Sequence, residues 1–133
     1  MTPREHALQL LDNDPFSQWM GIDLVDADEG RCRVACTVRD EMTNGYHVAH
    51  GGILFSLADT ALAFAAATLG KPALAIDHSI SFLKKCEPGD RLTASATCVS
   101  STRKTGVFSV DVTNQHGEKV AFMKGTVYRT GSS

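Results

Sequence analysis

One acidic residue stands alone in the most apolar stretch of the sequence. Residues 53–69 contain four polar side chains: Ser56, Asp59, Thr60 and Thr68. Only Asp59 among them is charged, and a carboxylate in apolar surroundings is costly without a partner or water. We therefore expect Asp59 to be hydrogen-bonded or to lie in a cleft that water reaches, where a carboxylate could act as nucleophile or base. The alternative is an aspartate on a narrow solvent-facing stripe.

A glycine pair precedes this stretch and follows a loop rich in polar residues. The loop runs from Asn44 to His50, and Gly51 and Gly52 come next. Glycines at a helix start leave backbone N–H groups open to a ligand, and the helix dipole adds positive potential there. Such a terminus suits a thioester carbonyl, whose oxygen becomes an oxyanion during attack. Alternatively, the pair only permits a sharp turn from loop to helix.

The spacing between these two features has a consequence for assembly. Gly51 and Asp59 are eight residues apart, which is roughly 12 Å along a helix axis. A donor to a carbonyl oxygen and a carboxylate attacking the same carbonyl cannot stand so far apart. If both act in one reaction, they come from different chains across a two-fold axis, which predicts two equivalent sites in a dimer.

The surrounding pattern predicts which elements position these residues. Thr2-Pro3-Arg4-Glu5 is typical of a capped helix start, and we expect a helix over about 3–14, followed by a connecting segment over 16–21. A central helix is predicted over about 51–69, ended by Gly70. Alternating apolar and polar residues predict strands near 22–27, 32–38, 74–82, 92–98, 108–112 and 119–128. In the third segment, Leu74, Ile76, Ile80 and Phe82 are assigned to one face. Runs of consecutive strands indicate an α+β fold with an antiparallel sheet of about five to six strands, forming a single domain over 1–133.

Composition narrows the function classes. Lys and Arg number 13 against 15 Asp and Glu, so the chain lacks the one-signed charge of a nucleic-acid binder. Neither a secretory signal nor a membrane span is recognisable, and a cytoplasmic location is expected. The cysteines at 32, 36, 86 and 98 form no CxxC pair and are predicted to be reduced, packed thiols. His47 and His50 lack further ligands at zinc-like spacing, so no metal is expected.

The segment Asn44-Gly-Tyr-His-Val-Ala-His-Gly-Gly-Ile-Leu-Phe-Ser-Leu-Ala-Asp59 resembles the signature of hotdog-fold thioesterases. It is similar in particular to the phenylacetate-degradation, or PaaI-type, family. The likeness extends from about Gly21 to Arg129 and includes Ser81-Phe82-Leu83 and Pro88-Gly89-Asp90. The resemblance implies a long helix wrapped by an antiparallel sheet, in a dimer that pairs again into a homotetramer.

The resemblance also implies roles for four residues and a reaction. Asp59 matches the catalytic carboxylate, contributed by the partner subunit, and Gly51 the residue whose N–H polarises the thioester carbonyl. His50 and Asn44 match loop residues that shape the site. The implied reaction is hydrolysis of acyl-CoA, with phenylacetyl- or hydroxyphenylacetyl-CoA as substrate and no cofactor besides the coenzyme A that the substrate carries. Ala75 stands where some superfamily members carry a serine, which argues against a third catalytic side chain on this strand.

Further residues are candidates for holding the substrate. The predicted set comprises Gly52 at the helix start, Tyr46 and Phe55 for an aryl group, and Lys84, Lys85, Arg103 and Lys104 for the CoA phosphates. Core packing is an equally good interpretation of Phe55. For each basic pair, the alternative is ordinary solvated charge at a turn. His78 interrupts the apolar face of its strand and is interpreted as a satisfied core histidine.

Two mechanisms and two other functions remain open. Asp59 could attack the carbonyl to form a mixed anhydride, or it could deprotonate a water. In either case it must be ionised, and we expect Thr60 or loop N–H groups to support it. A non-catalytic acyl-CoA sensor on the same fold would have no need of this acid. A hotdog dehydratase would pair a histidine and an acid in a different order.

Overall fold

The computed structural model describes residues 1–130. Two short helices, α1 (Pro3–Asp12) and α2 (Pro15–Met20), precede β1 (Asp23–Asp28) and β2 (Arg31–Thr37). A 3₁₀ turn, η1 (Asp40–Met42), leads to α3 (Gly51–Ala67). Four strands follow: β3 (Ala73–Phe82), β4 (Arg91–Ser101), β5 (Thr105–Thr113) and β6 (Lys119–Arg129). The α+β class is confirmed, and so is the predicted order of two strands, a central helix and four further strands.

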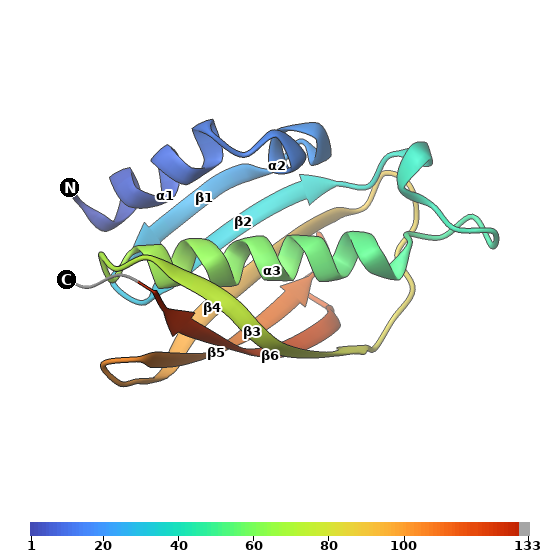
Figure 1. Cartoon of the computed structure of the whole chain (residues 1–133). Coiled ribbons are helices and arrows are strands. Elements are labelled where there is room, and N and C mark those ends of the chain that lie inside the picture. The colour runs from blue at the N-terminus through green and yellow to red at the C-terminus, as the bar shows by residue number, and fades with distance from the viewer. Residues whose placement is uncertain (131–133) are drawn as a thin grey trace.

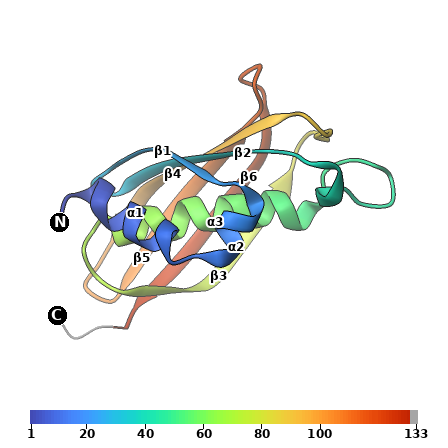
Figure 2. The ribbon, with the colours of Figure 1, turned by 90° about the horizontal axis from the view of Figure 1, so that it is seen from above.

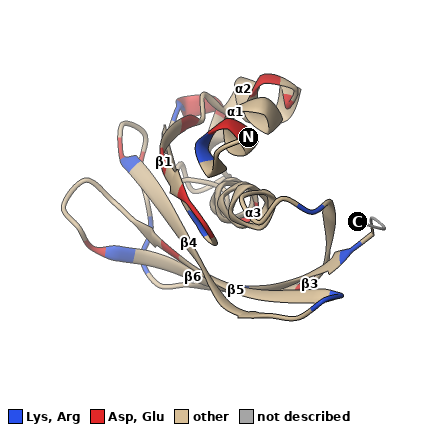
Figure 3. Ribbon diagram, turned by 90° about the vertical axis from the view of Figure 1, so that its left-hand side faces the viewer, with Lys and Arg blue, Asp and Glu red and all other residues tan. Residues whose placement is uncertain are grey.

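The six strands form one antiparallel sheet that curls around α3. Their order is β1-β2-β4-β5-β6-β3, so β1 and β3 are the edges. Figure 3, viewed nearly along α3, shows the sheet curving beneath the helix while α1 and α2 lie above it. Helix α1 contacts both α3 and β1, and it runs alongside them in Figure 1 and Figure 2. The expected helix wrapped by a sheet is therefore the observed architecture.

The core lies between α3 and the inner face of the sheet. The α3 residues Leu57, Ala58, Ala61 and Ala65 are fully buried. From β5, the inward residues Phe108, Val110 and Val112 are also fully buried, as their alternation predicted. The opposite side of α3 carries a stripe of small or polar residues that are exposed or half-buried: Gly52, Ser56, Asp59 and Ala63. Asp59 therefore lies on the uncovered side of an otherwise buried helix.

The N-terminal segment differs from the prediction. A single helix was expected over about 3–14, followed by a connection, but α1 ends at Asp12 and a second helix occupies 15–20. Asp14 caps this helix by accepting hydrogen bonds from the Ser17 N–H at 3.0 Å and the Ser17 hydroxyl at 2.7 Å. Pro15 occupies the first turn, where its missing N–H is harmless, and Gly21 ends the helix at φ 71°.

Strand β3 contains a bulge that changes which residues face inward. Its register against β6 shifts between Ala75 and Asp77, so Ile76 is an extra residue. Leu74 and Ile76 were expected on the face of Ile80, but they are 65% and 60% exposed. Because side chains alternate along a strand, one inserted residue reverses the facing of everything on one side of it. The edge strand therefore presents apolar side chains outward.

The remaining chemical expectations concern thiols and membranes. All four cysteines are unpaired, as predicted. Burial raises the pKa of Cys32 to about 12 and that of Cys36 to about 11, so both stay protonated at neutral pH. Among residues 1–130, no helix combines the length and the apolar character that crossing a membrane requires.

Candidate active site

The carboxylate of Asp59 is paired with a histidine from the edge strand. His78 Nε2 lies 2.7 Å from Asp59 Oδ1, and the two side chains are 7% and 43% exposed, respectively. Thr60, which was expected to support the acid, instead donates its hydroxyl proton to the Ser56 carbonyl at 2.8 Å. The partner of Asp59 is thus His78, and the expectation of a donor from Thr60 was wrong. The half-exposed carboxylate can reach a ligand on the open side of α3.

The start of α3 offers one backbone N–H to a ligand. His50 is the N-cap, and its Nδ1 accepts a hydrogen bond from the Gly52 N–H at 2.8 Å. The His50 carbonyl accepts from the Ile53 N–H at 2.9 Å. Within the described residues the Gly51 N–H makes no hydrogen bond. Gly52 was expected to offer a second open N–H, but His50 occupies it, so the free donor at this helix end is Gly51.

Gly51 also lies close to the Phe82 ring at the end of β3. A Cβ at this position would lie 3.1 Å from Phe82 Cζ, closer than side chains normally pack. Phe82 is 54% exposed, so its ring forms one wall of an open site beside the Gly51 backbone. This aromatic wall was not predicted from the sequence.

The loop before α3 is organised by Asn44. Its side-chain Oδ1 accepts hydrogen bonds from the N–H groups of Tyr46 at 2.9 Å and Val48 at 3.4 Å. His47 adopts φ 60°, a conformation that a non-glycine residue rarely takes and that this turn imposes. Asn44 therefore holds the loop shape, while Tyr46, predicted to line an aryl pocket, is 89% exposed in the single chain.

The predicted phosphate-binding pairs lie at opposite ends of the molecule. Lys84 and Lys85 follow β3, close to the start of α3, because the Cys86 carbonyl accepts from the Ala49 N–H at 2.7 Å. Arg103 and Lys104 form the turn between β4 and β5, beside the other end of α3 (Figure 1). Within one chain, only the lysine pair is near Gly51. In a dimer with antiparallel α3 helices, the Arg103–Lys104 turn of the partner would lie at that same end.

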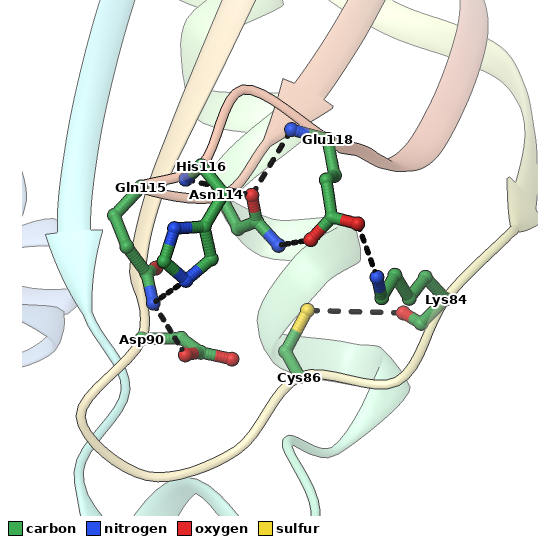
Figure 4. Close-up of polar contacts among 7 residues, drawn as sticks. All are labelled: Lys84, Cys86, Asp90, Asn114, Gln115, His116 and Glu118. Atoms are coloured by element: carbon green, nitrogen blue, oxygen red, sulfur yellow. Dashed lines mark hydrogen bonds and ion pairs between the residues drawn. The ribbon is translucent and has the colours of Figure 1, made fainter.

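Figure 4 shows how the Lys84 side chain is engaged. Its ammonium pairs with Glu118, which also accepts from Asn114 Nδ2 at 3.0 Å. The Lys84 ammonium and the Asn114 amide hold the pKa of Glu118 below its usual value. Lys85 lies 3.9 Å from Glu87 and is 73% exposed. Lys85 is therefore the freer of the two cations for a phosphate.

A cleft of about 380 Å³ opens next to the start of α3. Its lining includes Phe16 and Trp19 from α2 together with His50, Gly52 and Ser56. The two aromatic rings stack with centroids 6.0 Å apart. Neither Gly51 nor Asp59 lines this cleft, but their neighbours Gly52 and Ser56 do, whereas the other hollows, of about 480 and 750 Å³, lie away from the start of α3. The sequence interpretation missed Phe16 and Trp19 because it assigned this segment to a connection. Phe55, the other predicted aryl contact, packs beside His78, with ring centroids 5.9 Å apart.

Among residues 1–130, no three histidine, cysteine or acidic side chains gather where they could hold a metal ion. The arrangement that remains is an open backbone donor at one end of α3 and a histidine-paired carboxylate two turns along it. Such groups can polarise a carbonyl and attack it, or activate water, where both reach the same carbonyl.

Comparison with known proteins finds similarity to enzymes that act on thioesters. Residues 46–121 match the thioesterase superfamily. The chain is 39% identical to the acyl-coenzyme A thioesterase PaaI of Escherichia coli, over 97% of this chain and 92% of that protein. The structure of the E. coli PaaI protein from the phenylacetic acid degradation operon superposes with a TM-score of 0.93, covering 99% of each chain at 38% identity. A Streptococcus mutans protein bound to acetyl-CoA matches with a TM-score of 0.81 at 35% identity, covering 84% of this chain and 90% of the other.

Proposed function

The chain belongs to the thioesterase superfamily, as an acyl-CoA thioesterase of the PaaI type, and on that basis we propose that it hydrolyses arylacetyl-CoA to the free acid and CoA. The observation that carries the proposal is the distribution of chemical groups along α3. Its first N–H has no partner among the described residues, and its single acid is held by His78 on the uncovered face. Both groups are suited to a thioester carbonyl, and the reaction needs no bound cofactor because CoA is part of the substrate.

In the proposed mechanism, two subunits share each site. The Gly51 N–H of one subunit donates to the thioester carbonyl oxygen, and the α3 dipole stabilises the charge that develops there. Asp59 of the partner subunit attacks the carbonyl carbon or takes a proton from an attacking water. Collapse of the tetrahedral intermediate breaks the C–S bond and releases the CoA thiolate. In the nucleophilic variant, water then cleaves the mixed anhydride and returns the carboxylate.

Two surfaces support the proposed dimer. The outer edge of β3 has no strand beside it in the single chain, and it presents Leu74 and Ile76 to solvent. A long unpaired edge with apolar side chains is a template for pairing with another strand. The stripe of Gly52, Ser56 and Ala63 on α3 allows a second helix to approach closely. Pairing of two β3 edges would place two α3 helices antiparallel on one side of a continuous sheet. Further pairing of dimers into a homotetramer remains part of the proposal.

The aromatic cleft supports an aryl acyl group. Phe16 and Trp19 present ring surface within the same hollow as His50 and Gly52, which flank the free Gly51 N–H. The guanidinium of Arg39 lies 5.0 Å from the Trp19 ring centroid and covers it from another side, so the indole is held in place. An acyl group bound through Gly51 can extend toward these rings, whereas a short acyl group would leave them unfilled.

A thiol-release assay across acyl-CoA classes tests the proposed function. We expect the highest kcat/KM with phenylacetyl- or hydroxyphenylacetyl-CoA and lower values with acetyl- and palmitoyl-CoA. Trp19→Ala should reduce the aryl kcat/KM by about 10-fold, since it removes aromatic contact surface, and should change the acetyl value much less. Absence of thiol release from every substrate would overturn the proposed activity, and an unchanged acyl preference in Trp19→Ala would remove Trp19 from the acyl site.

Charge on the β3 edge should dissociate the proposed dimer. Ile76→Lys places a solvated cation where two edges would meet, and we expect sedimentation to report monomers and turnover to fall at least about 10-fold. Val99→Lys is the matched control, because Val99 is 64% exposed on β4, away from this edge. A fully active Ile76→Lys monomer would contradict a site shared between subunits.

A further inference from the structure

We propose that His78 is a positioning residue for Asp59: an imidazole bonded at both ring nitrogens that donates to one carboxylate oxygen and fixes its position. This inference rests on the proposed function, because it assigns His78 a role in the same reaction. It extends the interpretation of His78 as a satisfied core histidine.

The positions of both ring nitrogens set the protonation of the pair. His78 Nδ1 lies 2.8 Å from the Asp77 carbonyl oxygen, and Nε2 lies 2.7 Å from Asp59 Oδ1. A carbonyl oxygen only accepts hydrogen bonds, so Nδ1 carries a proton. An ionised carboxylate also only accepts, so Nε2 carries one as well while Asp59 is in its reactive form. In this arrangement both ring nitrogens of His78 act as donors while Asp59 is ionised.

The His78 ring occupies a space that the fold leaves open over Gly125. His78 lies opposite Gly125 of β6, and a Cβ on Gly125 would overlap the imidazole at Nδ1 and lie 2.6 Å from Leu62 Cδ1. Phe55 flanks the ring from α3. With glycine below, an aromatic ring beside it and hydrogen bonds at both nitrogens, the imidazole is confined to one orientation. The Asp59 oxygen that it contacts is confined with it.

Asp59 is the charged group that faces the imidazole from α3. On β6, Lys124 neighbours Gly125 and is exposed, so strand alternation places it on the opposite face. On β3, the Asp77 side chain is also exposed, and only its backbone carbonyl reaches the ring. The Nε2 donor of His78 is therefore directed at Asp59 Oδ1, which leaves Oδ2 as the oxygen for attack or proton transfer.

The role can be separated from simple core filling by three variants with wild-type acyl-CoA turnover as reference. His78→Met keeps side-chain bulk without a donor, and we expect kcat to fall about 10- to 100-fold with little change in KM, because a hydrogen bond to a charged group is lost. His78→Gln can donate a neutral N–H to Oδ1 and should recover at least part of kcat. Gly125→Ala keeps the histidine but places a methyl group in the space that the ring occupies, so it should resemble His78→Met. His116→Gln, a matched change at an exposed turn, should behave as wild type.

Recovery of kcat in His78→Gln supplies a readout that packing alone would not change, because glutamine restores a donor to Oδ1 without restoring the ring. Wild-type kcat in folded His78→Met, or no recovery of kcat in His78→Gln, would overturn the inference while leaving the proposed function intact. Full activity in Asp59→Asn would instead overturn the proposed function itself. If His78→Met does not fold, kcat of His78→Gln and of Gly125→Ala tests the inference in its place.

Discussion

Replacing Asp59 with asparagine should reduce acyl-CoA turnover by about 10³-fold, because it removes the nucleophile or base while keeping the shape of the side chain. The asparagine oxygen can still accept the hydrogen bond from His78 Nε2, so the surrounding geometry should survive. We expect kcat to fall and substrate affinity to stay within a few-fold of wild type. Thiol release and calorimetric binding of a non-hydrolysable acyl-CoA thioether measure the two effects separately.

Asp28→Asn is the matched control for this substitution. Asp28 is an exposed carboxylate at the end of β1, so its neutralisation should leave turnover unchanged. The measurement also decides between an enzyme and an acyl-CoA sensor. A protein that binds acyl-CoA equally well with and without the Asp59→Asn substitution, and never releases thiol, would be the sensor. Enoyl product in place of free thiol would instead revive the dehydratase alternative.

The sequence was informative for several features that local chemistry determines. The capping box at Thr2 and Glu5 forms as predicted, with hydrogen bonds of 2.8 and 3.1 Å. The central helix begins at Gly51, as predicted, and ends at Ala67, close to the expected Leu69. His50 caps the start of this helix through the Gly52 N–H, two residues away. In these cases the partners are a few residues apart, so their types and spacing suffice.

Features set by distant segments were not predicted. His78 and Asp59 are 19 positions apart and meet because β3 passes beside α3. A usable signal was present, since a histidine on the inner face of a strand and one acid on an apolar helix each need a partner. The bulge at Ile76 had no such signal, because alternation in the sequence continues through it.

The second helix is a local feature that was also missed. Asp14, Pro15 and Gly21 signalled it, because together they indicate a cap, a first turn and a stop.

Replacing Gly51 with proline should lower kcat/KM by about 10²- to 10³-fold, since it removes one backbone donor to the developing oxyanion. The change is compatible with the helix, because proline is favoured in the first turn and His50 has ψ 138°, which suits a residue before proline. Gly51→Ala is the control. It adds a Cβ 3.1 Å from Phe82 Cζ but keeps the N–H, and the exposed Phe82 ring can shift, so its loss should be much smaller.

Mixing Gly51→Pro with Asp59→Ala tests directly whether each site is shared between two subunits. If each site takes its N–H from one subunit and its acid from the other, a hybrid dimer contains one intact site and one doubly altered site. Random exchange makes half of the dimers hybrids, so activity should recover to about a quarter of wild type. Differently tagged subunits, refolded together and purified through both tags, should reach about half. If each site used its own chain for both groups, every site in the hybrid would lack one of them. Purified hybrids with no activity above the separate variants would therefore contradict the shared site. The eight-residue separation along α3 already argues for sharing, because it keeps the two groups of one subunit too far apart to act on a single carbonyl.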